Sequence, residues 1–430
     1  MQIDTLLHAR WIIPIEPENT VYENYSLAIN KGRIIDLLPS EQAKQTYQAI
    51  NSQELNEHVL LPGLINSHTH AAMTLLRGIA DDLPLMDWLQ NHIWPLEQRW
   101  VSEEFVKDGT DLAIAEMLLG GTTCFNDMYF FPEITAEQAI QRGIRASIGL
   151  IVFDFPTCWA KDSDDYINKG LALYERFKSE PLITTAFAPH APYTVSDEPF
   201  KKLHELAEQY HLKVHCHIHE TAHEVEDNRP LERLTQLGLI NQSLMAVHAT
   251  QLTQTEIEQL AQAGSSIIHC PESNLKLASG FCPIANCLAA GINVALGTDG
   301  AASNNDLDMF GEMRTAALLA KAVANNASAI PAMTALKMAT INGAKALGLE
   351  TEIGSLIIGK AADIIAVDLS DLATQPVYHP ISQIVYAASR NQVSDVWVAG
   401  KQVVKQRQLM TFDLKALKEK IALWQGRLAE

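Results

Sequence analysis

The sequence has little of several features that mark particular classes of protein. No apolar run approaches the roughly 20 residues needed to cross a bilayer, so no membrane-spanning segment is expected. The first residues, Met1-Gln2-Ile3-Asp4, lack a basic segment followed by an apolar stretch, so we expect no secretory leader and a cytoplasmic location. Positive charge is scarce: the formal net charge of −19 disfavours nucleic acid and anionic membranes as partners.

Cysteine is also sparse. Six cysteines are spread over 430 residues, which is too dilute for a disulfide scaffold and is typical of reduced thiols in a cytoplasmic enzyme. Four residues separate Cys282 from Cys287, so their spacing differs from the Cys-x-x-Cys of many zinc sites. We therefore expect no cysteine to act as a metal ligand or a nucleophile.

What the sequence does contain is a long alternation of apolar strands and helical stretches between residues 58 and 354. Hydrophobic residues make up 47% of the chain, enough for a sizeable core. Helical spacing is found, for example, at Asp197–Tyr210 and Thr253–Ala263. Such alternation predicts an α/β fold with parallel strands, and eight units favour a closed (β/α)₈ TIM-type barrel. The expected strands are Val59–Ser67, Thr122–Asp127, Arg145–Val152, Ile183–His190, Lys213–His219, Leu244–His248, Ser265–His269 and Asn293–Asp299.

Short β segments flank this barrel on both sides. The first 57 residues contain segments such as Tyr25–Asn30, and β character returns in Leu356–Val367 and Val393–Gln402. We expect residues 1–57 and 355–412 to form one small β-sandwich domain beside a barrel domain at 58–354. Residues 413–430 have the leucine and isoleucine spacing of a C-terminal helix.

Histidines gather where two of the expected strands end. His68 and His70 lie two residues apart, so on an extended chain they share a face, although His-x-His alone is a weak signal. His215, His217 and His219 alternate in the same way on the fifth strand, which a metal or a polar pocket explains better than ordinary packing. Because catalytic groups of such barrels gather at the carboxyl ends of strands, these side chains are candidates for one site.

Three further polar residues end expected strands. Asp299 closes an apolar strand, where it either faces a cation or caps the next helix, since an unpaired buried carboxylate is costly. Glu220 follows the fifth strand and is either a general base or a solvated loop carboxylate. His248 ends the sixth strand, and such a histidine is often only structural. Nitrogen and carboxylate donors that converge above the barrel would suit Zn²⁺ or Fe²⁺, which generate hydroxide from water near pH 7 and so indicate hydrolysis.

Several longer stretches carry a resemblance to a known family. The chain resembles the amidohydrolase superfamily, within it the cytosine deaminase-like group, and in particular the enzymes that deaminate methylthioadenosine and S-adenosylhomocysteine. The resemblance covers essentially the whole chain. The matching stretches are Leu61–His70, Trp94–Glu97, Ala188–His190, His217–Glu220, His269–Lys276, Leu296–Asn304 and Gly354–Asp363.

The resemblance implies a set of roles for residues of this chain. His68, His70, His217 and Asp299 would hold one divalent ion, most simply Zn²⁺ with Fe²⁺ as the alternative. One ion is expected because the fourth strand, Ile183–His190, lacks the lysine or glutamate of binuclear relatives. The implied catalytic residues are Glu220, His248 and Asp299, and the implied substrate contacts are Glu97, His190, Glu220 and Asp299.

The implied reaction is hydrolytic deamination of an adenosine-type nucleoside. In that interpretation Glu220 passes a proton from water to the ring nitrogen beside the reacting carbon, Asp299 passes one to the leaving amine, and Glu97 accepts from the ribose diol. Some relatives carry an arginine after the third strand, but Gly149–Thr157 has none, so the choice among methylthioadenosine, S-adenosylhomocysteine and adenosine stays open.

Other functions remain as alternatives. A guanine or 8-oxoguanine deaminase, or an s-triazine amino- or chlorohydrolase, would share the same superfamily. A non-catalytic scaffold homologue would normally have lost the metal ligands, all four of which are present. The segment from Asp81 to Trp100, with three tryptophans, is either a substrate cover or apolar packing. A homodimer or higher homo-oligomer is expected from base rates alone.

Overall fold

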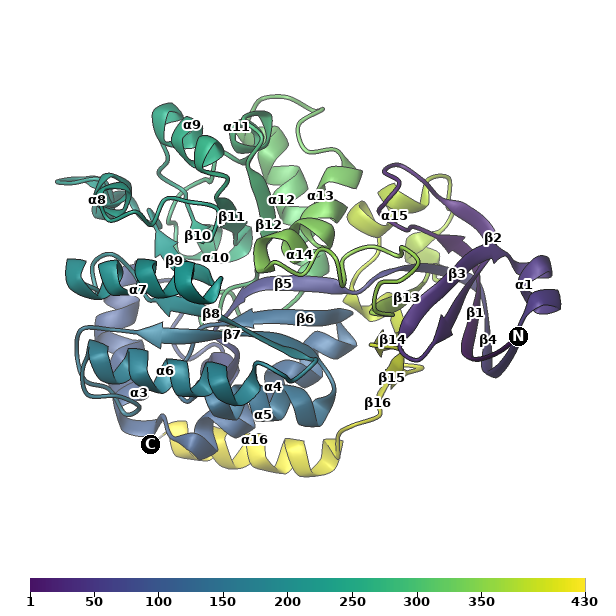
Figure 1. The fold of residues 1–430 in the computed structure, drawn as a ribbon, viewed down its shortest axis with the longest axis horizontal. Helices are drawn as coiled ribbons and strands as arrows, with labels where there is room; N and C mark the ends of the chain where they lie inside the picture. The colour runs from purple at the N-terminus through teal and green to yellow at the C-terminus, as the bar shows by residue number, and fades with distance from the viewer. Residues whose placement is uncertain (430) are drawn as a thin grey trace.

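The computed structural model describes residues 1–429 and confirms the predicted barrel (Figure 1). Eight parallel strands follow one another around the sheet in chain order, each paired with the strand before it. The barrel closes where the chain after the last strand meets the first, because the amide of Asp299 donates to the carbonyl of His68 at 3.0 Å. The strands are β5 (Leu64–Thr69), β6 (Thr122–Asp127), β7 (Arg145–Val152), β8 (Ile183–Pro189), β9 (Lys213–Ile218), β10 (Leu244–His248), β11 (Ser266–His269) and β12 (Asn293–Leu296).

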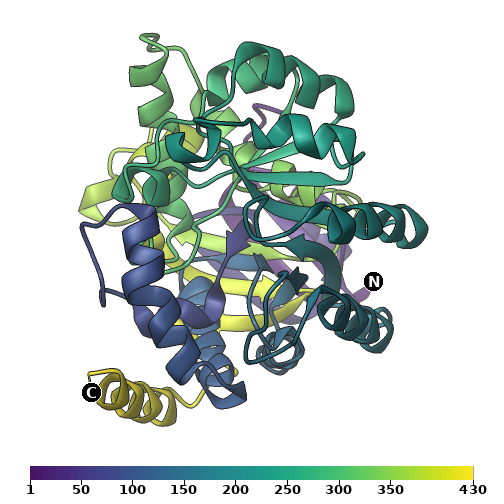
Figure 2. The ribbon, with the colours of Figure 1, turned by 90° about the vertical axis from the view of Figure 1, so that its left-hand side faces the viewer.

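Helices surround this sheet, as Figure 2 shows from the end of the barrel. Their starts and ends follow local signals: Thr253 and Glu256 form a reciprocal capping box at the start of α9, and Gly264 ends it at φ +70°. The helices of this part are α4 (Glu103–Leu119), α5 (Pro132–Arg142), α6 (Ser163–Phe177), α7 (Asp197–Tyr210), α8 (Pro230–Gln236), α9 (Gln254–Ala263), α10 (Pro271–Lys276), α11 (Ile284–Ala289), α12 (Met309–Val323), α13 (Ala332–Met338) and α14 (Ile341–Leu347).

Both ends of the chain build a second sheet. Its strand order, β16-β15-β14-β13-β4-β1-β2-β3, places the C-terminal strand β13 beside the N-terminal strand β4. Apolar side chains from both halves, among them Leu27, Leu60, Ile364 and Trp397, form its buried interior. The strands are β1 (Gln2–Ile12), β2 (Tyr22–Asn30), β3 (Arg33–Pro39), β4 (Gln48–Pro62), β13 (Ile364–Asp368), β14 (Val393–Val398), β15 (Lys401–Lys405) and β16 (Gln408–Leu409), with the short helices α1 (Ser40–Thr46) and α15 (Pro380–Tyr386) beside them.

The first expected barrel strand, Val59–Ser67, differs in the structure. Residues 59–62 are the end of β4 and pair in the small sheet, whereas the barrel strand begins at Leu64. An unbroken apolar run crosses this boundary, so hydrophobicity cannot mark it. The change of sheet takes place at Gly63, where any Cβ would collide with the side chain of Thr123.

The small sheet lies at one end of the barrel. In Figure 1 the arrows of β7 and β8 point away from the small sheet, so that sheet adjoins the amino ends of the barrel strands and leaves their carboxyl ends open. The final helix, α16 (Leu414–Leu428), runs back along α4, where the Trp424 indole and the Lys420 ammonium both bind the Asp108 carboxylate, at 3.1 and 2.6 Å. Within residues 1–429 no helix is both long and apolar enough to cross a membrane.

A buried ion pair fastens the small sheet to the barrel. Arg145, at the start of β7, donates through two nitrogens to the Asp363 carboxylate at 3.1 and 3.2 Å, and both side chains are less than a tenth exposed. Asp363 also accepts from the amide of Ala399 at 2.7 Å. These contacts join three segments that are far apart in the sequence.

We expect Asp363→Ala to lower the free energy of unfolding by about 3–5 kcal/mol, because it leaves a buried guanidinium without its carboxylate partner. Urea unfolding followed by circular dichroism measures the change. The matched control is Glu137→Gln, which removes one partner of an exposed pair with Arg176 and should cost no more than about 1 kcal/mol. Equal effects of the two substitutions would contradict the role assigned to the buried pair.

Candidate metal centre and substrate pocket

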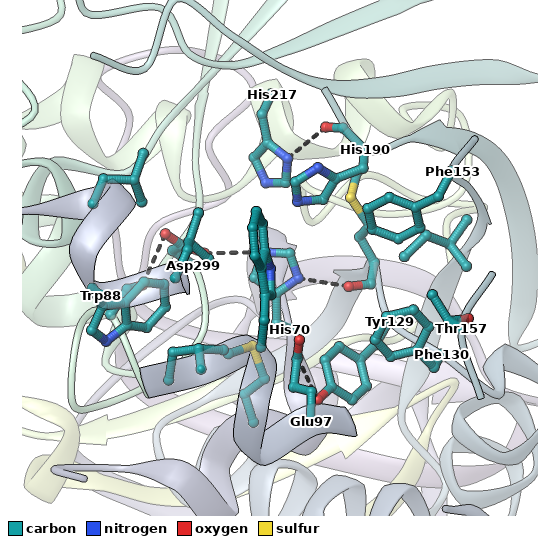
Figure 3. A pocket seen from close by; sticks show the side chains of 18 of the residues that line it. His70, Trp88, Glu97, Tyr129, Phe130, Phe153, Thr157, His190, His217 and Asp299 are labelled. Atoms are coloured by element: carbon teal, nitrogen blue, oxygen red, sulfur yellow. Dashed lines mark hydrogen bonds and ion pairs between the residues drawn. The ribbon is translucent and has the colours of Figure 1, made fainter. Parts of the chain in front are cut away.

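Four side chains meet at the carboxyl end of the barrel, and Figure 3 shows three of them, His70, His217 and Asp299. His68 lies on β5, His70 directly follows that strand, and His217 lies on β9, whereas Asp299 follows β12. One carboxylate oxygen of Asp299 lies 3.2 Å from Nε2 of His68 and 3.3 Å from Nε2 of His70. Nε2 of His217 lies 3.2 Å from Nε2 of His68. The residues expected to form one site are therefore brought together.

Backbone carbonyls fix the orientation of two of these rings. Nδ1 of His70 donates to the carbonyl of Met128 at 2.6 Å, and Nδ1 of His217 donates to the carbonyl of His190 at 2.7 Å. A ring that donates through Nδ1 presents the lone pair of Nε2, which is the form that binds a metal. Both Nε2 atoms consequently face the centre of the cluster.

Asp299 is held in place through its other carboxylate oxygen. That oxygen accepts from the hydroxyls of Ser273 at 2.6 Å and Ser303 at 2.9 Å. Burial opposes the charge of Asp299, but the proximity of the His68 and His70 rings outweighs it and holds the pKa of the carboxyl well below its usual range. The carboxylate thus stays ionised in a buried position, with one oxygen directed at the imidazoles.

The donor set fits a divalent cation. The described residues include two groups whose ligand atoms lie within 4.8 Å of one another: His68 with His217 and His248, and His68 with His70 and Asp299. Burial, the largest effect, lowers the pKa of His68 to about 4, so this imidazole is neutral at neutral pH. Neutral imidazoles and one ionised carboxylate are the donors of catalytic zinc sites.

Glu220 and His248 adjoin this cluster. Nδ1 of His248 donates to the Asn274 side chain at 2.9 Å, which leaves its Nε2 3.7 Å from a carboxylate oxygen of Glu220. Burial, and then the charges of Asp299 and Glu224, raise the pKa of Glu220 well above its usual range. A carboxyl with a raised pKa is suited to both taking up and releasing a proton during a reaction.

The other two histidines of the fifth strand behave differently from each other. Nε2 of His215 lies 2.9 Å from Nδ1 of His68, so a hydrogen bond between them fixes the orientation of the His68 ring. His219 does not share their face: the chain turns there at φ +53°, and its buried ring lies 4.0 Å from the carboxylate of Glu256. Strand alternation was a sound guide only as far as Ile218, where β9 ends.

The cluster forms one end of a pocket of about 670 Å³. The segment between Asp81 and Trp100 supplies much of its wall, from α2 (Leu85–Asp87), a π-helical turn at Trp88–Ile93 and α3 (Trp94–Trp100). This segment therefore covers the pocket, although Trp100 itself packs on Trp424. The wall residues from this segment are Leu85, Trp88, Leu89, Ile93, Trp94, Glu97 and Gln98.

Glu97 and His190, for which the sequence resemblance implies substrate contacts, line the same pocket. The Tyr129 hydroxyl donates to Glu97 at 2.8 Å, and burial, the largest effect, raises the pKa of Glu97 to about 7. His190 stacks on Phe153 with ring centres 4.7 Å apart. Burial lowers the pKa of His190 to about 3, so its ring is neutral and can both donate and accept.

Several residues that position the site were not singled out from the sequence. Ser273 and Asn274 lie on α10 and bind Asp299 and His248, and Tyr129 binds Glu97. The stretch His269–Lys276 was noted for its resemblance, but nothing in it indicates which side chain faces which ligand. Only the fold brings α10 against the ends of β10 and β12.

The comparisons with known proteins agree with this geometry. The model of the amidohydrolase family matches residues 59–403. The chain belongs to the amidohydrolase family. An amidohydrolase of Teredinibacter turnerae, named 5-methylthioadenosine/S-adenosylhomocysteine deaminase, is 51% identical over 432 residues, which cover 99% of this chain and 98% of that protein.

Two solved structures extend the comparison to the fold. A crystal structure of an adenosine deaminase from Xanthomonas campestris with bound zinc has a TM-score of 0.98 and 52% identity and covers 100% of this amidohydrolase and 99% of that chain. Atrazine chlorohydrolase from Arthrobacter aurescens, complexed with zinc, has a TM-score of 0.90 over 98% and 99% of the two chains. At 23% identity this second likeness shows the shared fold alone.

We expect Asp299→Ala to lose its metal. The purified protein should retain about one equivalent of transition metal, and the variant less than about a fifth, because the only charged ligand is gone. Elemental analysis of both proteins, each checked for folding by circular dichroism, measures this. Asp164→Ala is the control, since Asp164 is exposed and pairs with Lys202. Full metal occupancy in the Asp299 variant would show that this carboxylate is not an important ligand.

Proposed function

We propose that this amidohydrolase deaminates adenosine-type nucleosides by hydrolysis. The products would be S-inosylhomocysteine from S-adenosylhomocysteine, methylthioinosine from methylthioadenosine, and inosine from adenosine, each with release of ammonia. One observation carries the proposal: a single pocket holds both the hydrolytic cluster around Asp299 and a wall carboxylate, Glu97, suited to a ribose diol. The names of the Teredinibacter and Xanthomonas relatives support the same substrate class.

His68, His70, His217 and Asp299 would hold one divalent ion, for which the zinc in the Xanthomonas structure favours Zn²⁺. When bound, this ion lowers the pKa of a water molecule to about 7 and so supplies a nucleophile at neutral pH. No lysine or glutamate lies on β8 to hold a second ion. The proposal is therefore a mononuclear site.

Glu220 is the proton carrier in this proposal. Its raised pKa and its place beside His248 allow it to take a proton from water and give it to N1 of the adenine ring. Protonation at N1 makes C6 electrophilic, so that the water oxygen bonds to C6. Positioned proton transfer of this kind contributes about 10²–10⁴-fold to a rate.

The remaining side chains direct the attack and the departure of the amine. Asp299 takes the second proton of the added water, which is now a hydroxyl on C6, and passes it to the exocyclic amine. The C6–N bond then breaks, the C6 carbonyl forms and ammonia leaves. His248, held by Asn274, orients the attacking oxygen. His190, which lines the same pocket, would contact the purine.

The alternatives fit the pocket less well. Guanine and s-triazines have no ribose, so neither explains why a carboxylate with a pKa of about 7 is set in the wall and bound by Tyr129. A non-catalytic scaffold protein does not require a complete set of metal donors with oriented imidazoles. We also propose a cytoplasmic location, because all six cysteines are free thiols, and a homo-oligomer remains a prediction from base rates.

A substrate panel on metal-quantified protein tests the proposal. We expect adenosine, methylthioadenosine or S-adenosylhomocysteine to show the ultraviolet change of adenine-to-hypoxanthine conversion, because only these substrates carry a diol for Glu97. Guanine and melamine serve as the controls from the alternative functions. Turnover of either control without turnover of any adenosine compound would reject the assignment.

We expect Glu220→Gln to keep the metal and lose at least about 100-fold in kcat, because the ligands remain and only the proton carrier is removed. Steady-state kinetics and elemental analysis are measured on the same sample. Glu226→Gln is the matched control, since Glu226 is exposed and pairs with the exposed His223. A Glu220 variant with unchanged kcat would refute the role of this carboxyl.

A further inference from the structure

Beyond Glu97, the pocket has a wall of aromatic and small side chains. We call Phe130, Phe153, Phe155, Pro156, Thr157 and Cys158 the apolar lobe. The ring of Phe153 lies 5.9 Å from that of Phe130 and 4.9 Å from that of Phe155. Figure 3 shows Phe130, Phe153 and Thr157 on the same side as Tyr129, which binds Glu97.

This location matters because Glu97 is the proposed acceptor for the ribose diol. Phe130 packs against Tyr129 with ring centres 5.2 Å apart, and Phe153 stacks on His190. The apolar lobe is therefore continuous with both proposed substrate contacts. A substituent on the 5′ carbon of a ribose held at Glu97 would extend along this wall.

The pocket offers no positive side chain to such a substituent. Among its described lining residues there is no lysine or arginine, and the acids are Glu97, Glu220 and Asp299. Arg99 lies two residues after Glu97 in the sequence, but it is exposed, stacks on Trp100 and does not line the pocket. The lining histidine beside the apolar lobe, His190, stacks on Phe153, and its Nδ1 lies 3.0 Å from the Thr194 hydroxyl.

We propose that the enzyme selects nucleosides with a small uncharged 5′-alkylthio tail, such as methylthioadenosine, and discriminates against the amino-acid tail of S-adenosylhomocysteine. The inference rests on the proposed deaminase function and specifies its substrate. A thioether methyl group gains from burial against aromatic rings. An amino-acid carboxylate would lose its hydration there without meeting a lysine or arginine side chain.

The direct test compares kcat/KM for methylthioadenosine, S-adenosylhomocysteine and adenosine on one metal-quantified sample. We expect methylthioadenosine to exceed S-adenosylhomocysteine by about 100-fold, the cost of leaving one charged group unpaired. Adenosine should lie below methylthioadenosine, because its hydroxyl forgoes the apolar contact. Values for the two thioethers within about threefold of each other would overturn the inference and leave the deaminase proposal intact. Absence of turnover with all three would overturn the deaminase proposal as well.

A second experiment tests whether missing positive charge causes the discrimination. Phe155 is 43% exposed at the edge of the apolar lobe, so Phe155→Arg can be accommodated without a buried charge. We expect this variant to raise kcat/KM for S-adenosylhomocysteine by about tenfold, because a guanidinium pairs with carboxylate. The matched control, Phe155→Leu, changes size but not charge and should give no rise.

Equilibrium binding separates recognition from chemistry. Each Phe155 substitution is combined with Glu220→Gln, and calorimetry then measures the Kd of both thioethers without turnover. The arginine should tighten binding of S-adenosylhomocysteine and not that of methylthioadenosine. An equal gain with leucine, or no gain with arginine, would contradict the assignment of the discrimination to charge in this lobe.

Discussion

The carboxylate of Asp299 is the constraint around which the site is built. A buried carboxylate costs several kcal/mol unless hydrogen bonds and a positive partner offset its lost hydration. Here the two oxygens have separate roles, since one accepts from Ser273 and Ser303 and the other faces His68 and His70. Because the backbone amide of Asp299 also bonds to the carbonyl of His68, the same contact closes the barrel and places the carboxylate beside its neighbours. Fold and site therefore depend on one junction.

Much of this architecture could be predicted from the sequence. Apolar strands in alternation with helical stretches identify a barrel, and polar residues that interrupt such strands at their ends, as His217 and Asp299 do, identify the mouth of the site. Periodicity failed where the backbone leaves its regular path. At Gly63 an unbroken apolar run passes from one sheet into the other, and at His219 a positive φ turns the side chain off the strand face. Neither event changes the hydrophobic pattern, so neither is visible in it.

The supporting contacts could not be predicted for a different reason. Ser273 and Asn274 are neighbours on α10, yet one serves Asp299 and the other His248. Their roles come from where a short helix packs, which depends on tertiary contacts rather than on local spacing. The roles of the three tryptophans between Asp81 and Trp100 also depend on tertiary contacts. Trp88 and Trp94 line the pocket, whereas Trp100 packs on Trp424 of α16, and no local sequence signal distinguishes them.

One property of the pocket serves both chemistry and selection. Burial raises the pKa of Glu220, which suits this carboxyl to proton transfer, and burial also raises the pKa of Glu97 to about 7. A cation placed among them to bind a charged tail would lower both pKa values, since charge interactions are strong where water is excluded. A pocket of this size therefore cannot easily keep these raised pKa values and also bind an anionic substituent through a cation. Phe130, Phe153 and Phe155 bring no cation into the pocket, so the wall that leaves both pKa values raised also offers no partner to a charged tail.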